Sequence, residues 1–447
     1  MTDSILHWNL VALNALKTDF SLPDPRPPEL MPQQPGPTYA SRALAIVHLA
    51  MYDAYMGVRE PAKTYLPYTA PGAGTNDVQA AQAAVAAAAC ITLISLFSRQ
   101  RDSFLKSHND FVATLPDNDP KIAQGLAWGH RVGRAMLEAR RGDGAEAPDD
   151  LYAPSAEPYR HRGDPLSPPS GVLGPQWGAV KPFGFENLRT SITDLPDPVM
   201  LPEYDADFAE VAAKGRKTGS TRTADETTIG LFWAYDGARN IGVPPRLYNQ
   251  VVRDIVAKKG GVSEKANARL FAMVNVAMAD AGVQAWHEKY RHNLWRPVLG
   301  IREADAGWGP TGKGDSHPAT HGDPYWQPLG APRTNSSGRP SFTPPFPAYP
   351  SGHATFGTAA LRLVQAELQL AGSFAFESQS DEFDGVSVGE GGTRPLHKRA
   401  LTIDQAVEEN ILSRVYLGVH WKFDGRKGEL IGNEIAQKVQ ANFPVKA

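Results

Sequence analysis

Apolar residues recur at three- and four-residue spacing along much of this chain. That spacing gives an α-helix one continuous apolar face. The alternating pattern of half-buried strands is scarce by comparison. The sequence therefore predicts a mostly helical fold, and Asn76 and Asp77 are the candidate N-caps of an alanine-rich helix. The segments with the helical pattern are 4–18, 40–57, 76–98, 103–114, 120–141, 247–258, 264–291, 354–371 and 403–417.

Long stretches rich in proline and glycine separate these segments. Residues 22–37, 143–205 and 304–350 cannot form regular helix. Loops of this length in a compact protein are usually functional or wrap the surface. Because no flexible Ser/Gly linker divides the chain, we expect a single domain, 1–447. Within it we expect an N-terminal half, about 1–205, to pack on a C-terminal half, about 206–447.

Composition narrows the class of protein. The 447 residues carry a net charge of −3, so no basic surplus points to nucleic acid or an anionic membrane as partner. The only cysteine, Cys90, rules out intrachain disulfides and Cys-based zinc sites, and we interpret it as a small buried residue. No signal peptide is seen at the start, and the most apolar window, 83–97, is too short to span a bilayer. We expect a soluble protein, cytoplasmic by default, and the residues leave an unusual export route open.

The first stretch with candidate chemistry is WHEKYRHNLWRP, residues 286–297. Lys289 and Arg296 are seven residues apart, which on a helix places them on nearly one face, two turns apart. Trp286 lies on the same side. Pro297 disfavours continued helix at Arg296. Taken alone, the stretch is explained better as a solvated basic face.

A second stretch, PSGH at 350–353, comes directly before an apolar helical pattern. If Ser351 and Gly352 open that helix, their backbone N–H groups are unpaired and form an anion site. The Ser351 hydroxyl adds a donor, and glycine lets a ligand approach the backbone closely. His353 would stand beside the site.

The third stretch is SRVYLGVHWKFD, residues 413–424. Arg414 and His420 are six apart, so one helix would not aim both the same way, and Gly418 can break the helix between them. If residues 420–424 are helical, the Asp424 carboxylate can accept from the His420 ring and fix its tautomer. Alone, an ordinary helix end with a buried histidine is the slightly better explanation.

Taken together, the three stretches supply one kind of group, the donor to an oxyanion. Three cations that converge in a buried site need a counter-charge, because desolvated charges of one sign are prohibitively costly. A tetrahedral oxyanion such as phosphate or vanadate would supply it. The donors are Lys289, Arg296, Ser351, the Gly352 amide, His353, Arg414 and His420.

In order and spacing, K-x6-RP, PSGH and SR-x5-H-x3-D resemble the superfamily of vanadium-dependent haloperoxidases and type 2 phosphatidic-acid phosphatases. The stretches FWAYDGARNIGVPPRLYNQ (232–250), PLGAPRTN (328–335) and FTPPFPAYPSGHATFG (342–357) are similar to the chloroperoxidase branch. The N-terminal half resembles that branch only loosely, and 371–402 is shorter than in fungal members. The resemblance implies an all-α fold: a large, mainly helical domain with two packed four-helix bundles and long Pro/Gly-rich loops.

The resemblance also implies roles for single residues. His420 would bond to vanadium through its ring nitrogen, and His353 would be the acid–base group that deprotonates bound peroxide. Asp236 would pair with Arg414. The expected catalytic residues are His353, Asp236, Arg414 and Lys289. The groups expected to hold the vanadate oxygens, in a site that phosphate can also occupy, are Lys289, Arg296, Ser351, Gly352 and Arg414.

Two aromatic residues, Trp286 and Phe346, match the halide site of the family. Bromide-selective relatives tend to carry a histidine where this chain has Phe346, which favours chloride competence. The remaining histidines of the C-terminal half match no motif role, and we interpret them as structural or surface residues. They are His287, His292, His317, His321 and His397.

The function implied is a vanadate-dependent haloperoxidase, favoured to be a chloroperoxidase. Its partners would be hydrogen peroxide, chloride or bromide, and a small organic acceptor that the hypohalous acid halogenates. Two alternatives stay open: an acid phosphatase with His420 as nucleophile, and a non-enzymatic oxyanion-binding protein. The residues distinguish neither the acceptor nor a monomer from a homodimer.

Overall fold

The computed structural model describes residues 3–22, 30–68, 76–148, 152–167, 171–336 and 339–444. Within these ranges the chain is mainly helical, with one two-stranded sheet, which confirms the all-α prediction. The helices are α1 (Ser4–Asp19), α2 (Gly36–Arg59), α3 (Val78–Leu96), α4 (Arg101–Val112), α5 (Pro120–Ala139), α6 (Leu188–Ser191), α7 (Tyr204–Lys214), α8 (Ala224–Phe232), α9 (Pro244–Lys259), α10 (Glu264–His292), α11 (Pro297–Glu303), α12 (Gly352–Glu367), α13 (Ile403–Tyr416) and α14 (Lys422–Asn442).

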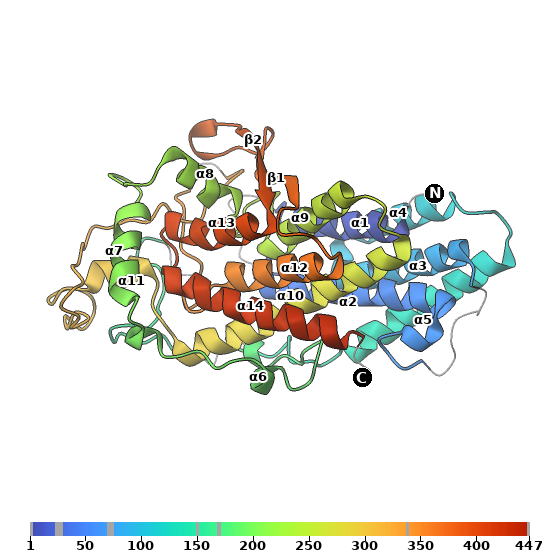
Figure 1. The fold of residues 1–447 in the computed structure, drawn as a ribbon, viewed down its shortest axis with the longest axis horizontal. Helices are drawn as coiled ribbons and strands as arrows, with labels where there is room; N and C mark the ends of the chain where they lie inside the picture. The colour runs from blue at the N-terminus through green and yellow to red at the C-terminus, as the bar shows by residue number, and fades with distance from the viewer. Residues whose placement is uncertain are drawn as a thin grey trace.

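The N-terminal helices α1–α5 form the first bundle (Figure 1). Its closest contact joins α3 to α5, where Gly125, Gly129 and Gly133 recur every fourth residue. A Cβ added at Gly129 would lie 2.1 Å from the backbone oxygen of Ala84. The glycines thus allow the two helix backbones to approach closely. Asp77 caps α3 as predicted, and Cys90 is buried.

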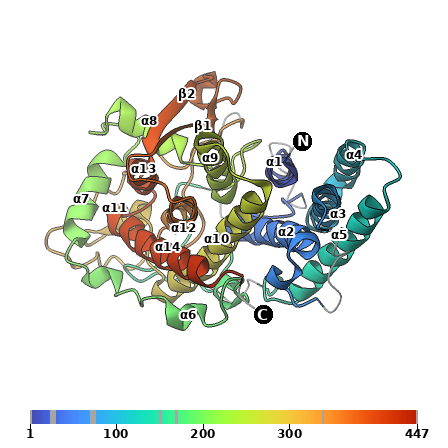
Figure 2. The ribbon, with the colours of Figure 1, turned by 45° about the vertical axis from the view of Figure 1, so that its right-hand side comes forward.

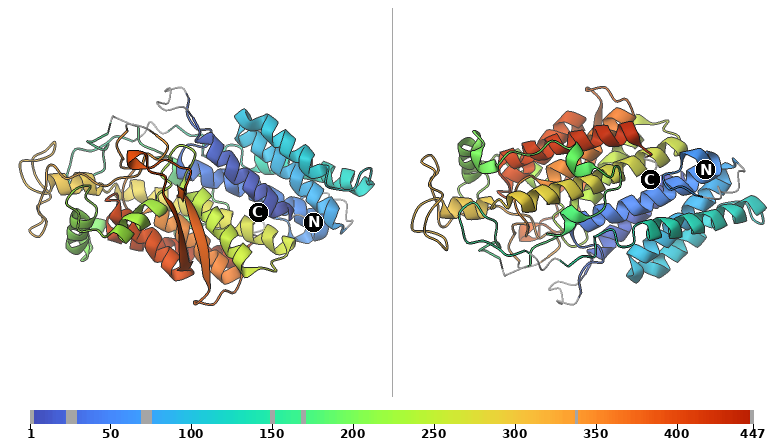
Figure 3. Two further views of the ribbon diagram at one scale, coloured as in Figure 1. Left: turned by 90° about the horizontal axis from the view of Figure 1, so that it is seen from above. Right: turned by 90° about the horizontal axis from the view of Figure 1, so that it is seen from below.

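The second bundle surrounds α12. Helices α9, α10, α13 and α14 all pack against it (Figure 2). Helix α10 also packs on α2 and so joins the two bundles, which Figure 3 shows toward opposite ends of the molecule. One hydrophobic core runs through both. The N-terminus of α12, which carries the PSGH stretch, therefore lies inside the molecule.

Five helices and the sheet were not predicted. Helix α14, the longest of these, packs on its neighbours partly through glycines: a Cβ at Gly428 would lie 2.7 Å from the Ser351 backbone oxygen. Its apolar repeat, Ile431, Ile435 and Val439, is short, because glycines and Asp424 fill most buried positions of its first turns. The others are the shorter helices α6, α7, α8 and α11. Strands β1 (Ala375–Asp384) and β2 (Leu396–Thr402) form an antiparallel hairpin over α8, α9 and α13.

The long loops follow the surface of the bundles. Short helical turns interrupt 143–205, and its part after 171 lies on the second bundle, where the Phe183 and Gly184 amides donate to Asp280 of α10. No helix or strand forms between 304 and 350 in the part that the structure describes. Residues 23–29, inside the predicted loop 22–37, lie outside the described residues. The division near residue 205 stays a prediction.

One described helix, α3, is long and apolar enough to cross a membrane by length and composition. In this structure 72% of its apolar window is buried against the rest of the protein. Its apolar character is thus explained by its central place in the first bundle.

The α3–α5 contact gives a prediction about stability. Gly129→Ala should lower the free energy of unfolding by about 2 kcal/mol, because the new methyl group meets the Ala84 carbonyl and forces the helices apart. Gly133→Ala is the matched control, since its nearest atoms would lie 3.2 Å away and it gains the same helix propensity. Urea unfolding would measure both. Equal stabilities of the two variants would contradict the close-contact account.

Candidate active site

Ser351 and Gly352 open α12 as predicted. Ser351 is the N-cap, and its hydroxyl accepts from the Ala354 N–H at 3.5 Å. One expectation was wrong: the Ser351 N–H is not unpaired but donates to the Asp424 carbonyl at 2.8 Å. For the Gly352 N–H, no partner is found among the described residues. The anion donors at this helix end are therefore the Gly352 amide and the Ser351 O–H.

Lys289 and Arg296 reach the same region from different elements, in line with the prediction that Pro297 disfavours continued helix at Arg296. Helix α10 ends at His292, and Asn293 follows in the left-handed conformation, with φ 52°. Arg296 is then the N-cap of α11, ahead of Pro297. The proline fixes the start of the new helix and so turns the chain at this point.

Arg296 is fully buried and holds three elements together. Its Nε donates to the Phe346 carbonyl at 2.9 Å, and its Nη1 donates to the Val419 carbonyl at 2.7 Å. Nη1 also lies 2.8 Å from Nε2 of His420. Nη2 is buried without a partner among the described residues. A buried guanidinium N–H of this kind is a donor that awaits an acceptor.

Lys289 differs from expectation. Its Nζ donates to the carbonyls of Pro347, Ala348 and Pro350. An ammonium group has three protons, so all of them are used by the loop. Lys289 thus offers no free N–H to an oxyanion in this structure, although its charge lies 5.2 Å from the centre of the Phe346 ring.

Arg414 and Asp236 form the ion pair that the resemblance implied. The carboxylate accepts from Nη1 at 3.0 Å and from Nη2 at 2.9 Å, in the parallel geometry that suits a guanidinium. Both side chains are buried, 1% and 5% exposed. The Arg414 Nε is buried and unpartnered within the described chain. Like Arg296, Arg414 therefore has one N–H group that is available to a bound anion.

His420 has a fixed tautomer. Its Nδ1 donates to the Asp424 carboxylate at 2.8 Å, as predicted, so Nε2 carries the lone pair. The two residues are not on one helix, however, because α14 begins after its N-cap, Trp421. Gly418, with φ 70°, ends α13, and a Cβ there would lie 2.5 Å from the Gly215 backbone oxygen.

Hydrogen bonds to the ring and to the backbone carbonyl of His353 fix its orientation. Nε2 lies 2.6 Å from the Ala234 carbonyl, which only accepts, so Nε2 carries the proton and Nδ1 is the free acceptor. Tyr248 and Asn410 each donate to the His353 carbonyl at 2.9 Å. No sequence motif marks these two residues, because their side chains donate to a backbone atom.

Both histidines are neutral at neutral pH. Burial, and then the charge of Arg414, lowers the pKa of His353 well below its usual value. Burial, and then Arg296, does the same to the pKa of His420. Each ring can therefore act through a lone pair.

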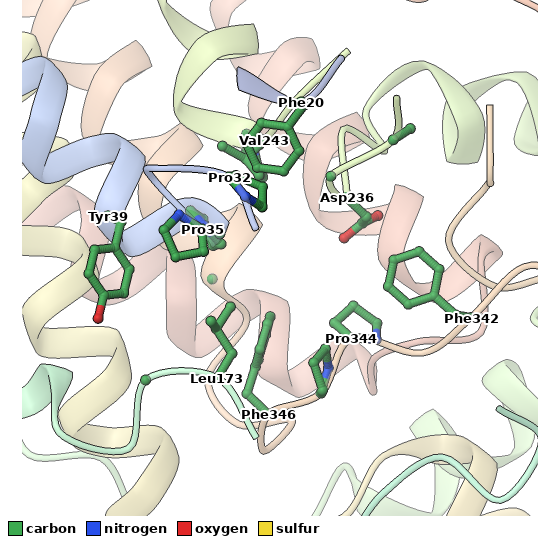
Figure 4. A pocket seen from close by; sticks show the side chains of 18 of the residues that line it. Phe20, Pro32, Pro35, Tyr39, Leu173, Asp236, Val243, Phe342, Pro344 and Phe346 are labelled. Atoms are coloured by element: carbon green, nitrogen blue, oxygen red, sulfur yellow. The ribbon is translucent and has the colours of Figure 1, made fainter. Parts of the chain in front are cut away.

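A cavity of about 580 Å³ opens onto this group. Gly352, His353, Arg414 and His420 line it, whereas Lys289, Arg296 and Ser351 are not among the residues that line it. Trp286 and Phe346 form one wall, with ring centres 4.9 Å apart. In Figure 4, Asp236 faces the cavity across from Leu173 and Phe346.

The five remaining histidines of the C-terminal half are not among the residues that line this cavity. His292 lies 3.2 Å from Glu288, and His317 lies 3.0 Å from Asp205, which fits structural roles. Sequence reasoning missed His161, which is 1% exposed and whose two ring nitrogens have no hydrogen-bond partner among the described residues. Burial, and then the charges of Arg296 and Lys289, lowers its pKa well below the usual value.

Comparisons with known proteins agree with this geometry. The vanadium chloroperoxidase N-terminal domain matches residues 1–174, and the vanadium chloroperoxidase second helical-bundle domain matches residues 269–444. Vanadium chloroperoxidase of Curvularia inaequalis is 32% identical over an alignment that covers 95% of this chain and 79% of that protein. The chain belongs to the vanadium haloperoxidase family.

Solved structures show the same fold. A bacterial vanadium-dependent iodoperoxidase matches 99% of this chain and 96% of its own with a TM-score of 0.71 at 20% identity. The holo form of a bacterial vanadium-dependent chloroperoxidase matches 91% of this chain and 93% of its own with a TM-score of 0.63 at 16% identity. The haloperoxidase fold is therefore shared by proteins named for different halides.

The donor set of this family member fits an oxyanion. Arg296 Nη2 and Arg414 Nε are buried donors without partners in the described ranges, and the Gly352 N–H lies at the same helix end as the Ser351 O–H. Across the described chain no group of three His, Cys, Asp or Glu side chains is placed to hold a metal cation. Cationic and neutral N–H and O–H donors are what a phosphate-like anion requires.

The two neutral histidines predict a pH dependence of stability. Their folded pKa values lie below the unfolded value of about 6.5, so the unfolded chain binds protons first on acidification. Their contribution is complete above that pH and is lost below it, by at most about 1.4 kcal/mol per pH unit for each histidine.

Urea unfolding between pH 8 and pH 5 would measure this dependence. His353→Asn should flatten the loss of stability below pH 6.5, because the variant lacks one of the protonating groups. The exposed His321→Asn is the control and should follow the wild-type curve. A His353→Asn curve parallel to that of the wild type would contradict a neutral buried His353.

Proposed function

We propose that this chain is a vanadate-dependent haloperoxidase that uses hydrogen peroxide to oxidise halide, chloride included, to hypohalous acid. Family membership supports vanadate and peroxide, since the relatives are named as vanadium-dependent peroxidases. The observation that carries the proposal is that His353 and His420 line the cavity close to two buried arginines, Arg296 and Arg414, each of which has an N–H without a partner among the described residues. Burial lowers the pKa of both histidines and so leaves their rings neutral.

The residues that would hold vanadate follow from their free atoms. Nε2 of His420 would offer its lone pair to the metal. The vanadate oxygens would accept hydrogen bonds from Arg296 Nη2, Arg414 Nε, the Ser351 O–H and the Gly352 N–H. When bound, vanadate supplies a Lewis-acidic centre that activates peroxide without a change in its own oxidation state. Arg296 Nη1, now 2.8 Å from Nε2 of His420, would have to release that atom.

Asp424 keeps the His420 ring ready for this bond. By accepting from Nδ1, the carboxylate makes Nε2 the basic atom and fixes the plane of the ring. Lys289 contributes differently from the arginines. It fixes the 347–350 loop through three carbonyls, and its buried charge makes the neighbouring site more electron-withdrawing.

His353 would move the protons of the reaction. Peroxide, halide and one proton give hypohalous acid and water, so a group must take a proton from peroxide and deliver one to the departing oxygen. The neutral ring can accept at Nδ1, because Nε2–H is engaged by the Ala234 carbonyl. Tyr248 and Asn410 hold the residue in place through its own carbonyl.

Trp286 and Phe346 support chloride as a substrate. Both rings line the cavity, and the Phe346 ring lies 4.9 Å from the Arg296 guanidinium carbon. An apolar wall next to buried cations keeps water out and strengthens their field at the halide. Relatives of this chain are named for chloride and for iodide, so family membership does not identify the halide. The proposal of chloride therefore rests on the Trp286 and Phe346 wall.

An acid phosphatase is the second candidate. The His420–Asp424 pair that favours a metal bond would equally favour attack on phosphorus, because both need a lone pair on Nε2. Vanadate separates the two functions, since it would activate a haloperoxidase and inhibit a phosphatase.

Adding orthovanadate to metal-free protein tests the proposed function. With peroxide and chloride or bromide, halogenation should appear only after vanadate is added. His353→Ala should bind vanadate yet lose about 100-fold or more of the turnover, since a general acid–base group contributes roughly that factor. No gain of halogenation on adding vanadate would reject the haloperoxidase, and phosphatase activity abolished by vanadate would favour the second candidate.

Phe346→His tests the halide wall. The ratio of kcat/KM for bromide over that for chloride should rise about tenfold, equivalent to about 1.4 kcal/mol. A polar ring admits water and weakens the field of Lys289 and Arg296, and chloride, the harder halide to oxidise, suffers more. Phe342→His, which changes another phenylalanine of the cavity lining, is the control. An unchanged ratio in Phe346→His would remove the halide-site assignment.

A further inference from the structure

The cavity above His353 is much larger than the proposed chemistry with peroxide and halide requires. Its volume is about 580 Å³. A water molecule takes about 30 Å³ of liquid, and halide and peroxide are of similar order. Pockets that bind organic ligands have volumes of roughly 300–1,000 Å³. The cavity therefore has room for an organic molecule beside the reacting groups.

Most of the cavity wall is apolar and rigid. Proline fixes its own backbone angle, so a proline wall is formed before any ligand arrives. Flat proline and phenylalanine faces pack well against an aromatic ring. Figure 4 shows these side chains around the space: Phe20, Pro32, Pro35, Phe342, Pro344 and Phe346.

A cation interrupts this apolar wall. Arg239 lines the cavity three residues after Asp236, on a tight turn that the Gly237 N–H closes by donating to the Gly242 carbonyl at 2.8 Å. Asn335 donates to the Arg239 carbonyl and ties the turn to the 328–335 loop.

The Arg239 guanidinium has no ion pair in the part of the chain that the structure describes, and its Nε is buried without a partner. A buried N–H that lacks an acceptor is costly, and an anionic group on a ligand would satisfy it. Arg333 also lines the cavity, with its guanidinium carbon 3.8 Å from the centre of the Phe342 ring. Both groups add positive charge to this side.

We propose that the cavity binds the organic acceptor itself, an electron-rich aromatic compound with a carboxylate, such as a phenolic acid. Its ring lies against the proline and phenylalanine wall, and its carboxylate accepts from Arg239. The inference rests on the proposed haloperoxidase function and names the acceptor class for the same site. Halogenation then takes place on a bound molecule and not only in free solution.

The chemistry of the bound acceptor balances. Halide loses two electrons to hydrogen peroxide, which with one proton gives hypohalous acid and water. The acceptor ring then forms a carbon–halogen bond and loses the proton of the carbon–hydrogen bond. That proton leaves with the hydroxide of hypohalous acid as a second water. No further oxidant or reductant is needed.

Binding to the full-length, vanadate-loaded protein tests the acceptor site without turnover. The probes are 3-(4-hydroxyphenyl)propanoate and its neutral primary amide, measured by isothermal titration calorimetry. The wild type should bind the carboxylate at least about tenfold more tightly than the amide, as expected for one charge-assisted hydrogen bond. Arg239→Gln should bring the two affinities together, and Arg239→Lys should restore part of the difference.

A control variant separates local recognition from overall charge. Arg134→Gln removes one exposed arginine from α5 and should keep the wild-type difference. Equal affinity of the wild type for both probes, or a difference that persists in Arg239→Gln, would overturn the acceptor site. So would an Arg239→Gln variant whose only defect is a raised KM for halide.

The two proposals fail separately. Binding of the carboxylate that depends on Arg239 would support the acceptor site even if vanadate brought no halogenation, in which case the haloperoxidase proposal fails alone. Product analysis adds a second readout: the ratio of mono- to dihalogenated product from the wild type should differ from that of hypohalite in solution. An identical ratio would show that the acceptor reacts unbound.

Discussion

The burial of three cations in one place is the constraint on which the site depends. Lys289, Arg296 and Arg414 are all 1% exposed or less. Removing such charges from water is costly unless each is paired and hydrogen-bonded. Asp236 forms an ion pair with Arg414, and backbone carbonyls accept from Lys289 and Arg296. The nearby Asp424 carboxyl group further offsets the charge of Arg296. The donors left over are those that an oxyanion would take.

This constraint also explains the histidines and the loops. Neighbouring cations and burial keep His353 and His420 neutral, so each has a lone pair for chemistry. The proline-rich 344–350 segment supplies carbonyls that a helix would have used internally, and three of them receive Lys289. The irregular backbone is thus part of the electrostatic balance of the site.

Much of the site could be predicted because its residues cluster in three short stretches with characteristic spacing. Pro297 indicated that Arg296 leaves the helix of Lys289, but the sequence could not show how the chain turns between them, since that depends on the left-handed Asn293. Nor could it show that the Ser351 amide is already used by Asp424, a contact between distant segments. Helix α14 was missed because its apolar repeat is confined to Ile431, Ile435 and Val439, after first turns whose buried face is mostly glycine and Asp424. His161 was missed because no motif surrounds it.

A crystal structure with orthovanadate would show whether this buried group of donors holds an oxyanion bonded to histidine. We expect vanadium bonded to Nε2 of His420, with Arg296 and Arg414 donating to its oxygens and the Asp424 carboxylate still accepting from Nδ1. Vanadate bound elsewhere, or bound at this position with Nε2 of His420 still paired with Arg296, would contradict this expectation.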